Sequence, residues 1–551
     1  MKGNFNMARP VNEKILEYLP GSRERRELGR KLNELKNEVI EIPLIIGGRE
    51  IRTGNLKDVR IPHNKEHVIA RYHMAGEEEL MMAVEAAVEA GEKWRNMPWQ
   101  HRASVFLKAA DLLSSSWRQL LNASTMLGQS KTVIQAEIDS ACELTDFLRY
   151  NAYFMQEIYK DQPESSLKEW NRTEYRPLEG FVLAISPFNF TAIGGNLSSA
   201  PAIMGNTVVW KPSGTAIYSN YFVMRLLMEA GMPAGVINFV PSRGSDIEKH
   251  VISSEHLAGV HFTGSTKVFN NIWKNVGMNL DRYRNYPRLV GETGGKDFIF
   301  AHNSADIKQL ATAMVRGAFE YQGQKCSAAS RAYIPASIWE ALRDRMEYEL
   351  GKIQIGETED FDNFMGAVID RNSYDNIERY IKFAKNSEDA EIIFGGHVDD
   401  SVGYFVEPTV VVTDDPEFKL LKEEIFGPVL TIYVYEDENL METLEICDTT
   451  SPYALTGAIF ASDRDVIRDM EKALLYSAGN FYINDKPTGA VVGAQPFGGG
   501  RKSGTNDKAG SRLNLLRWTS ARTIKENYNP PKNILYPYME EKTPVSVKAE
   551  V

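Results

Sequence analysis

Residues 181–240 read FVLAISPFNFTAIGGNLSSAPAIMGNTVVWKPSGTAIYSNYFVMRLLMEAGMPAGVINFV, and they alternate short apolar runs with longer helical patterns. FVLAIS, TVVWK and GVINFV are typical of buried strands, and helices are predicted from about Gly194 and from about Ala216. A helix from about Ser245 and the run LAGVHFT extend the pattern. Strand, helix and strand at this rhythm indicate right-handed crossovers and therefore a parallel, doubly wound sheet.

The same rhythm begins again after Gly295, with FIFA, a helix over Ile307 to Tyr321, RAYIP, a helix over Ser337 to Leu350, and then TIYVYE, LTGAIFAS and GNFYIND. A chain of 551 residues exceeds one ordinary core, so a second α/β domain is expected. We predict a helical extension over 1–40, a first α/β domain over 41–160 and 177–295, and a second over 296–505. Segments 161–176 and 506–530 fit neither rhythm, and 531–551 forms a tail whose last dozen residues we expect to be disordered.

Composition excludes several classes of protein. A net charge of −11 and a pI near 5.5 argue against a nucleic-acid surface, and no apolar run approaches the roughly 20 residues of a membrane span. The start lacks the apolar stretch of a signal peptide, and GSRERRELGRKL is typical of a solvated helix rather than a transit peptide. Three cysteines exclude a disulfide framework and fit a reducing cytosol, and the absence of a CxxC pair together with nine scattered histidines indicates no structural metal site. We therefore expect a cytoplasmic location.

Cys326 is the residue most suited to covalent chemistry. It is flanked by Gly323, Lys325 and other small or polar residues in FEYQGQKCSAASR, whereas the other two cysteines sit inside amphipathic patterns typical of buried small residues. A thiolate is a strong nucleophile, and Glu292 in LVGETGGKDF could take a proton or activate a water. Together the two residues suggest chemistry through a thioester.

The first α/β domain has the layout that binds a dinucleotide outside the carboxyl ends of its strands. GxGxxG and GxxxxGK[ST] are both missing, but FTGST at 262–266 could place Gly264, Ser265 and a helix start around a phosphate. In VVWKPSG, Lys211 and Ser213 could meet ribose hydroxyls. The alternatives are an ordinary strand-to-helix turn and a surface lysine before a turn.

Seven segments occur in a characteristic order: ISPFNF at 185–190, WKPSG at 210–214, FTGST at 262–266, GETGGK at 291–296, GQKCS at 323–327, EEIFGPV at 423–429 and PFGGGRKSG at 496–504. Together, over about residues 40 to 530, they resemble the aldehyde dehydrogenase superfamily. SPFNFTAIGGN, NDKPTGAVVGAQPFGG and SGTND are similar to the branch that oxidises glutamate γ-semialdehyde to glutamate with NAD in proline catabolism. The resemblance implies two doubly wound parallel-sheet domains, the first binding NAD and the second carrying the nucleophile, plus a small β flap for oligomerisation.

The resemblance also implies roles. Cys326 would attack the aldehyde carbon, Asn189 and the Cys326 N–H would hold the oxyanion, and Glu292 would activate the hydrolytic water. Glu424 would hold the nicotinamide ribose with Phe426 beside the ring. The rest of the cofactor would lie on Ser186, Lys211, Ser213, Gly244, Gly264 and Ser265.

For the substrate, the family's anchor loop matches Thr488-Gly489-Ala490. The N–H groups of Gly489 and Ala490, with the Ser327 hydroxyl, would bind the α-carboxylate; some relatives have serine in place of Ala490. The methylene chain would lie between Phe190 and Phe497. Glu143, coupled to Lys325, would meet the ammonium, or would be an ordinary helix-surface carboxylate.

Three alternatives remain at this point: an aldehyde dehydrogenase for another small aldehyde, an inactive binding relative, and a thiol acyltransferase without NAD. Intact Cys326, Glu292 and Asn189 argue against the second, and Lys211, Ser265 and Glu424 argue against the third. KPSGTA lacks a glutamate that would repel a 2′-phosphate, so NADP stays open beside NAD. The two flap segments are expected to pair as strands that reach a neighbouring subunit, giving a homodimer or higher oligomer.

Overall fold

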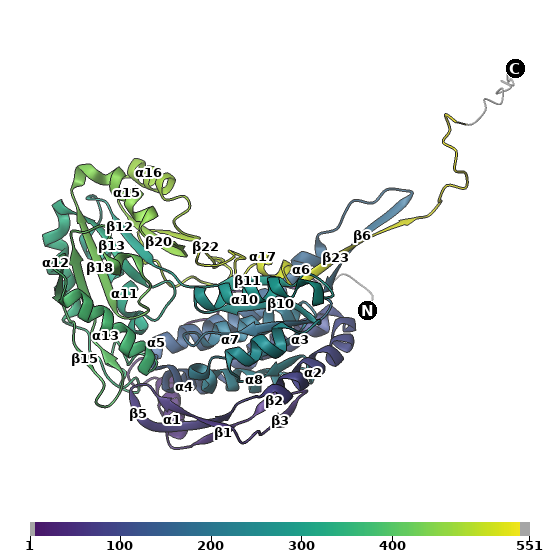
Figure 1. Cartoon of the computed structure of the whole chain (residues 1–551), viewed down its shortest axis with the longest axis horizontal. Helices are drawn as coiled ribbons and strands as arrows, with labels where there is room; N and C mark the ends of the chain where they lie inside the picture. The colour runs from purple at the N-terminus through teal and green to yellow at the C-terminus, as the bar shows by residue number, and fades with distance from the viewer. Residues whose placement is uncertain (1–5, 540–551) are drawn as a thin grey trace.

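The computed structural model describes residues 6–539, which form two α/β bodies side by side and a two-stranded arm that projects away from them (Figure 1). Each body is built around a seven-stranded, mainly parallel sheet, as the strand–helix rhythm predicts. The segment expected to be disordered at the C-terminus, 540–551, lies outside the described residues.

The first sheet has the strand order β11-β10-β7-β8-β9-β2-β3. Its parallel strands are β7 (Phe181–Ile185), β8 (Thr207–Lys211), β9 (Ile237–Phe239), β10 (Leu257–Thr263) and β11 (Arg288–Glu292). Two short antiparallel strands, β2 (Leu44–Ile46) and β3 (Arg49–Ile51), extend its edge. The sequence rhythm did not predict these two, because three-residue strands leave almost no period to recognise.

Helices cover both faces of this sheet, so its strands are apolar on both sides. Val182 and Val208 pack with α3 (Trp99–Leu113), α4 (Arg118–Gln129), α6 (Leu144–Lys160), α7 (Thr191–Ile203) and α8 (Ile217–Glu229). Leu183 and Val209 pack on the other face with α2 (Glu77–Asn96) and α10 (Thr266–Met278). This alternation explains why the strands read as continuous hydrophobic runs.

The second sheet has the order β14-β17-β18-β13-β12-β20-β21. Its strands are β12 (Asp297–Ala301), β13 (Ala329–Pro335), β14 (Ala390–Phe394), β17 (Thr409–Thr413), β18 (Val429–Tyr435), β20 (Thr456–Phe460) and β21 (Asn480–Ile483). Only the edge strand β14 is antiparallel to its neighbour. The flanking helices are α11 (Ile307–Phe319), α12 (Ala336–Leu350), α13 (Arg371–Lys385), α15 (Leu440–Thr449) and α16 (Arg464–Ala473).

The N-terminal region differs from the expected helical extension. Only α1 (Arg23–Lys36) is helical there; Ser22 caps it, and it buries Leu28, Leu32 and Leu35. Residues 6–18 instead run without regular structure. A three-stranded sheet of β1 (Ile40–Ile42), β5 (Asn64–His73) and β4 (Leu56–Ile61) follows α1.

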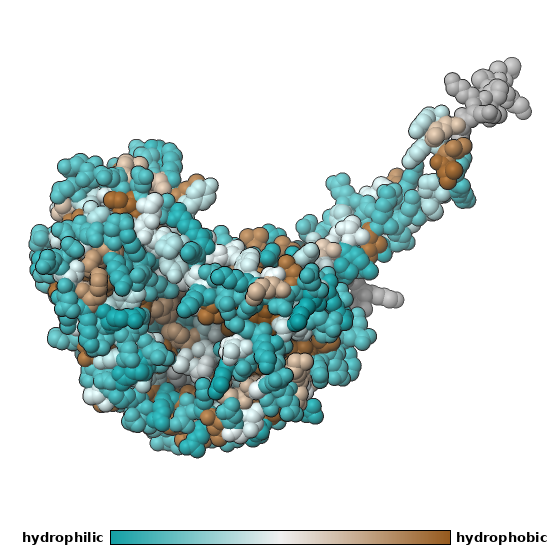
Figure 2. Space-filling model, viewed as in Figure 1, coloured by the Kyte–Doolittle hydropathy of each residue, from teal (hydrophilic) through white to brown (hydrophobic). Residues whose placement is uncertain are grey.

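The arm consists of β6 (Glu169–Pro177) and β23 (Thr519–Asn527), paired antiparallel along their whole length. It is shorter than the segment 506–530 implied. Helix α17 (Arg512–Leu516) packs on α6, and Leu515 and Trp518 are fully buried, so residues 506–518 belong to the body. Figure 2 shows a mainly hydrophilic surface with hydrophobic residues in the hollow between the bodies and along the arm, where Leu167 and Trp170 are exposed.

Within residues 6–539, no helix is both long enough and apolar enough to cross a bilayer.

Candidate active site

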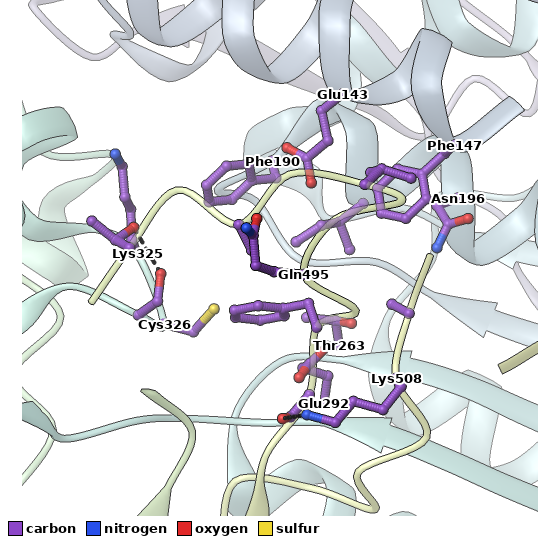
Figure 3. A pocket seen from close by; sticks show the side chains of 18 of the residues that line it. Glu143, Phe147, Phe190, Asn196, Thr263, Glu292, Lys325, Cys326, Gln495 and Lys508 are labelled. Carbon is purple, nitrogen blue, oxygen red and sulfur yellow. Dashed lines mark hydrogen bonds between the residues drawn. The ribbon is translucent and has the colours of Figure 1, made fainter. Parts of the chain in front are cut away.

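One cavity lies where the two bodies and the loop over residues 486–509 meet (Figure 3). The sulfur of Cys326 points into it, Glu143 and Phe190 come from the wall opposite, and Glu292 lies beside Lys508. The cavity brings together eight residues singled out from the sequence: Glu143, Phe190, Glu292, Cys326, Ser327, Gly489, Ala490 and Phe497.

The backbone before Cys326 is held in an unusual conformation. Tyr321, Gln322 and Gly323 have φ values of 53°, 55° and 64°, so three consecutive residues are left-handed directly after α11 ends. Such a run is costly for residues other than glycine and persists only where the surroundings determine it. The Gln322 side chain supplies part of that support by donating to the carbonyl oxygens of Ser130 (3.0 Å) and Ala367 (2.7 Å).

The two glycines of GETGGK allow two close approaches. A Cβ on Gly295 would lie 2.1 Å from the Cys326 carbonyl oxygen, and one on Gly294 would lie 2.3 Å from the Glu424 carboxylate. The Gly295 N–H donates to Glu424 Oε1 at 2.9 Å. Glycine at both positions therefore lets the Cys326 carbonyl and the Glu424 carboxylate lie close to the connection between β11 and β12.

The electrostatics keep the thiol protonated. Burial raises the pKa of Cys326 well above its ordinary value, and the nearby carboxylates of Glu292, Asp297 and Glu424 raise it further. Burial also raises the pKa of Glu292 to about 8, opposed by the Lys508 ammonium. A carboxyl group with a pKa near 8 can exchange a proton with the thiol or with a water at physiological pH.

Asn189 directly precedes Phe190, which lines the cavity. The Asn189 side chain is buried, and Nδ2 donates to the Gln324 carbonyl oxygen at 3.1 Å. An amide carries two N–H donors, so one remains for an oxyanion. The observed bond also ties the turn before α7 to the loop that carries Cys326.

The far end of the cavity is the anchor loop. Gly489 has a φ of 96°, a left-handed conformation that favours glycine. The Ser327 hydroxyl donates to Thr488 Oγ1 at 2.9 Å, and Lys486 Nζ donates to the Thr488 carbonyl oxygen at 3.1 Å. Ser327 thus uses its proton within the protein, and the Thr488 hydroxyl becomes an additional donor that sequence reasoning did not assign.

Glu143, at the end of the π-helix η1 (Glu137–Glu143), is one of the acidic residues of the cavity. Of the two readings, the structure places it in the cavity wall, and burial raises its pKa to about 8. The Lys325 charge opposes the rise in the Glu143 pKa, as the expected coupling implies, but the two side chains form no ion pair. Lys325 Nζ pairs instead with Glu320 Oε2 at 3.4 Å, because the left-handed turn folds the chain back toward the end of α11.

The expected cofactor residues lie in two groups. Ser186, Lys211, Gly264 and Ser265 follow the carboxyl ends of the adjacent parallel strands β7, β8 and β10, and Ser265 caps α10 by accepting from the Val268 N–H. Glu424 and Phe426, which has a φ of 60°, lie nearer the nucleophile.

These residues fit a dinucleotide. Burial lowers the pKa of Lys211, and its ammonium has no acceptor among residues 6–539. A half-buried cation and the N–H groups of a helix start at the same edge of the sheet are suited to ribose hydroxyls and phosphate. Ser186 accepts from Trp210 Nε1 at 3.0 Å and so supports the strand edge.

Two expected cofactor residues are less suited to that role. Gly244 begins the three-residue helix α9 (Gly244–Asp246) and is exposed. The Ser213 hydroxyl shares a hydrogen bond with Thr215 at 3.1 Å. In the described part of the chain, no group of three or more His, Cys, Asp or Glu side chains is placed to hold a metal ion.

Residues 52–524 match the sequence profile of the Aldehyde dehydrogenase family, so the chain belongs to that family. Within it, the chain is 56% identical over 537 residues to a protein of Dictyostelium discoideum named "Delta-1-pyrroline-5-carboxylate dehydrogenase, mitochondrial", covering 97% of this chain and 96% of that protein. It is 50% identical over 531 residues to the human protein of the same name, with 96% and 94% covered.

The solved structures to which this chain is similar have the same kind of name as these relatives. The Delta-pyrroline-5-carboxylate dehydrogenase from Mycobacterium tuberculosis, described as bound with NAD, has a TM-score of 0.95 and 49% identity, covering 98% of this chain and 100% of that one. The 1-pyrroline-5-carboxylate dehydrogenase from Thermus, also described with bound NAD, has a TM-score of 0.89 and 31% identity, with 95% and 100% covered.

The expected cytoplasmic location is wrong. The relatives from Dictyostelium discoideum, cattle and human are all named mitochondrial. The inference rested on the reading of the N-terminal segment as neither signal nor transit peptide and on free cysteines, and Cys142, Cys326 and Cys447 are indeed unpaired. Free thiols persist in any reducing compartment, so they could not distinguish the cytosol from the mitochondrial matrix.

Proposed function

We propose that this chain oxidises L-glutamate γ-semialdehyde, the open form of Δ1-pyrroline-5-carboxylate, to L-glutamate with NAD as hydride acceptor in proline catabolism. One observation carries the proposal: a single cavity holds Cys326 and Glu292 at one end and the turn at Gly489 and Ala490, opposite Glu143, at the other. The names of the similar proteins support the substrate.

The Cys326 sulfur bonds to the aldehyde carbon, and the thiol proton passes to the ionised Glu292 carboxylate. The oxyanion is held by the second N–H of the Asn189 amide and by the backbone N–H of Cys326. NAD, when bound, supplies the chemistry of accepting a hydride from that carbon. The carbon is then a thioester on Cys326.

Glu292 loses its proton to solvent and then removes one from a water. The water oxygen bonds to the thioester carbon, the carbon–sulfur bond breaks, and the Cys326 sulfur regains a proton. The product is a carboxylate. Both steps need the same carboxyl group close to the sulfur, and the shared cavity provides that.

We assign NAD to the first α/β body, with the phosphates at Gly264 and Ser265, ribose hydroxyls at Lys211, and the nicotinamide ribose at Glu424. Glu424 already accepts from the Gly295 N–H through Oε1, so Oε2 is the oxygen left for a ribose hydroxyl. The neighbours described as bound with NAD support NAD over NADP.

The substrate carboxylate is assigned to the N–H groups of Gly489 and Ala490 and to the Thr488 hydroxyl, which accepts from the Ser327 hydroxyl. Phe190 and Phe497 flank the methylene chain. The ammonium is assigned to Glu143. Its carboxyl group is neutral near pH 7 without a partner, and an arriving cation favours the ionised form.

The arm of β6 and β23 is assigned to a homodimer or higher homo-oligomer, since its strands have no neighbour beyond each other among residues 6–539. The names of the relatives support a mitochondrial location.

Reduction of NAD by the purified chain tests the proposal, with Δ1-pyrroline-5-carboxylate, succinic semialdehyde and propanal compared, each with NAD and with NADP. We expect kcat/KM to be highest for Δ1-pyrroline-5-carboxylate with NAD. A higher value for either other aldehyde would replace this substrate by that one, and no reduction with any aldehyde would exclude the activity.

A further inference from the structure

The N-terminal strap, residues 7–18, belongs to neither sheet and contacts the anchor loop and η1, which both contribute residues to the cavity wall. We infer that this strap is a specificity element: it clamps the anchor loop and the π-helix η1 from behind, so that Asn12 and Tyr18 position the groups that read the charged end of the substrate. The inference rests on the proposed function. In it, Asn12 and Tyr18 are positioning residues and not catalytic residues.

The first clamp acts on the anchor loop. Asn12 Nδ2 donates to the Val492 carbonyl oxygen at 2.7 Å and to Asp146 Oδ2, on α6, at 2.8 Å. Arg9 donates to the Gly493 carbonyl oxygen at 3.3 Å. Val492 lines the cavity two residues after Ala490. The strap therefore holds the carbonyls two and three residues after the carboxylate-binding turn.

The anchor loop depends on such contacts because it has no regular structure of its own. Residues 484–499 lie between β21 and β22 (Gly500–Arg501) without a helix or strand. Gly493 has a φ of 81°, and a Cβ there would lie 2.3 Å from the Tyr150 ring. The Tyr150 hydroxyl in turn donates to the Pro10 carbonyl oxygen (3.1 Å) and to Asn12 Oδ1 (3.2 Å). Strap, α6 and loop are thus packed as one unit.

The second clamp acts on η1. Glu137 is its first residue and is fully buried. Its carboxylate accepts from the Tyr18 hydroxyl at 2.8 Å and from the Leu16 N–H at 2.8 Å, beside its ion pair with Arg118. The same π-helix ends at Glu143 in the cavity wall. π-Helical turns are frequent at functional sites, and this one is anchored by the strap.

Both clamps hold the far end of the cavity, and neither contacts Cys326 or Glu292. A loosened strap should therefore weaken recognition of a zwitterionic aldehyde while leaving the chemistry on an uncharged one. A strap that only stabilises the fold would instead lower both activities together.

Asn12→Ala in the full chain tests this, with Val11→Ala as the matched control because the Val11 side chain is 83% exposed. Removing a donor to a buried carbonyl and a carboxylate should lower kcat/KM for glutamate γ-semialdehyde about tenfold, mostly through KM. The value for propanal should stay within about twofold. Val11→Ala should match the parent for both substrates.

Amide hydrogen exchange provides a readout that needs no substrate. Residues 488–495 should exchange faster in Asn12→Ala than in Val11→Ala or the parent, without a comparable change in β12 and β13. The exchange measurement still decides the inference if the parent chain proves not to oxidise glutamate γ-semialdehyde, because that result would overturn only the proposed function.

Equal losses for the two aldehydes, or unchanged exchange over 488–495, would overturn the inference. If Asn12→Ala does not fold, Arg9→Ala takes its place, because Arg9 is exposed and makes one hydrogen bond to the loop. It should shift the ratio of the two kcat/KM values about two- to threefold in the same direction, and an unchanged ratio would count against the clamp.

Discussion

Reactive cysteines usually gain thiolate from a nearby cation or a helix N-terminus, but Cys326 has carboxylates around it. Burial and these carboxylates raise its pKa, so the thiolate form is rare in the free protein. Transfer of the thiol proton to Glu292 during attack avoids a free thiolate. The same carboxyl group then serves the hydrolytic water, which places the control of both steps on one titrating residue.

The raised pKa of Glu292 predicts a pH dependence. Its carboxyl group is protonated below a pKa of about 8 and acts as a base above it, so hydrolysis of the thioester should rise with pH and level off above about 8. Glu292→Gln removes the base from both steps, so NADH should form more slowly in the first turnover, and later turnovers should be slower still because the thioester is not hydrolysed. Stopped-flow absorbance across pH measures both. A rise of the same shape in Glu292→Gln would assign the titration to another group.

A second residue-level prediction concerns Lys131. It is fully buried, its Nζ lies 2.7 Å from Asp139 Oδ2, and the Phe190 ring centroid lies 4.0 Å away. Lys131→Met leaves the Asp139 carboxylate buried without its cation, so we expect a loss of about 3–5 kcal/mol of unfolding free energy. Urea unfolding measures it, and adding Asp139→Asn should recover part of the loss. Independent, additive losses would show that the pair does not act as a unit.

The ion pair of Lys131 could not be predicted from the sequence. In GQSKT it reads as a polar residue at the end of a helix, and nothing in the pattern indicates a buried ion pair. Cys326 and Glu292 could be chosen because their surroundings depart from an amphipathic pattern. The partners of Lys325 and Ser327 could not, since Glu320 and Thr488 meet them only after the chain turns back on itself.

Secondary-structure elements were predictable in proportion to their length and period. The central strands and the helices α11 and α12 follow from the apolar rhythm, because buried parallel strands are apolar on both faces. The edge strands β2, β3 and β14 and the strap do not, since pairing at a sheet edge and side-chain contacts determine them. The same reason explains why α17 was assigned to the flap.

The anchor loop gives a prediction at the level of an element. Because Ser327 donates to Thr488, the two hydroxyls support one hydrogen-bond chain to the carboxylate. Ser327→Ala and Thr488→Val should each lower kcat/KM for glutamate γ-semialdehyde by roughly ten- to a hundredfold, and the double variant should be little worse than either. Propanal, which has no carboxylate, serves as the control substrate. A similar loss with propanal would mean that Ser327 supports Cys326 instead.

The two bodies and the arm differ in how much of their surface is buried. Both bodies close around buried cores, whereas the arm is a two-stranded ribbon in which Thr519 is buried and the other residues are exposed or half-buried. A two-stranded ribbon alone is marginally stable in water. Exposed Leu167 and Trp170 therefore indicate a surface that another molecule covers, and a second copy is the partner that the proposed oligomer supplies.

Sedimentation provides the test at this level. The parent chain at micromolar concentration should sediment as a multiple of the 62.1 kDa protomer. Trp170→Glu and Ile524→Asp place charges on β6 and β23, where they would be buried in an interface, so both should shift the population toward the protomer. Glu526→Gln, at an exposed position near the end of β23, provides a control that should leave the mass unchanged. A parent chain that sediments only at 62.1 kDa would show that the arm stands free and that oligomerisation does not stabilise it.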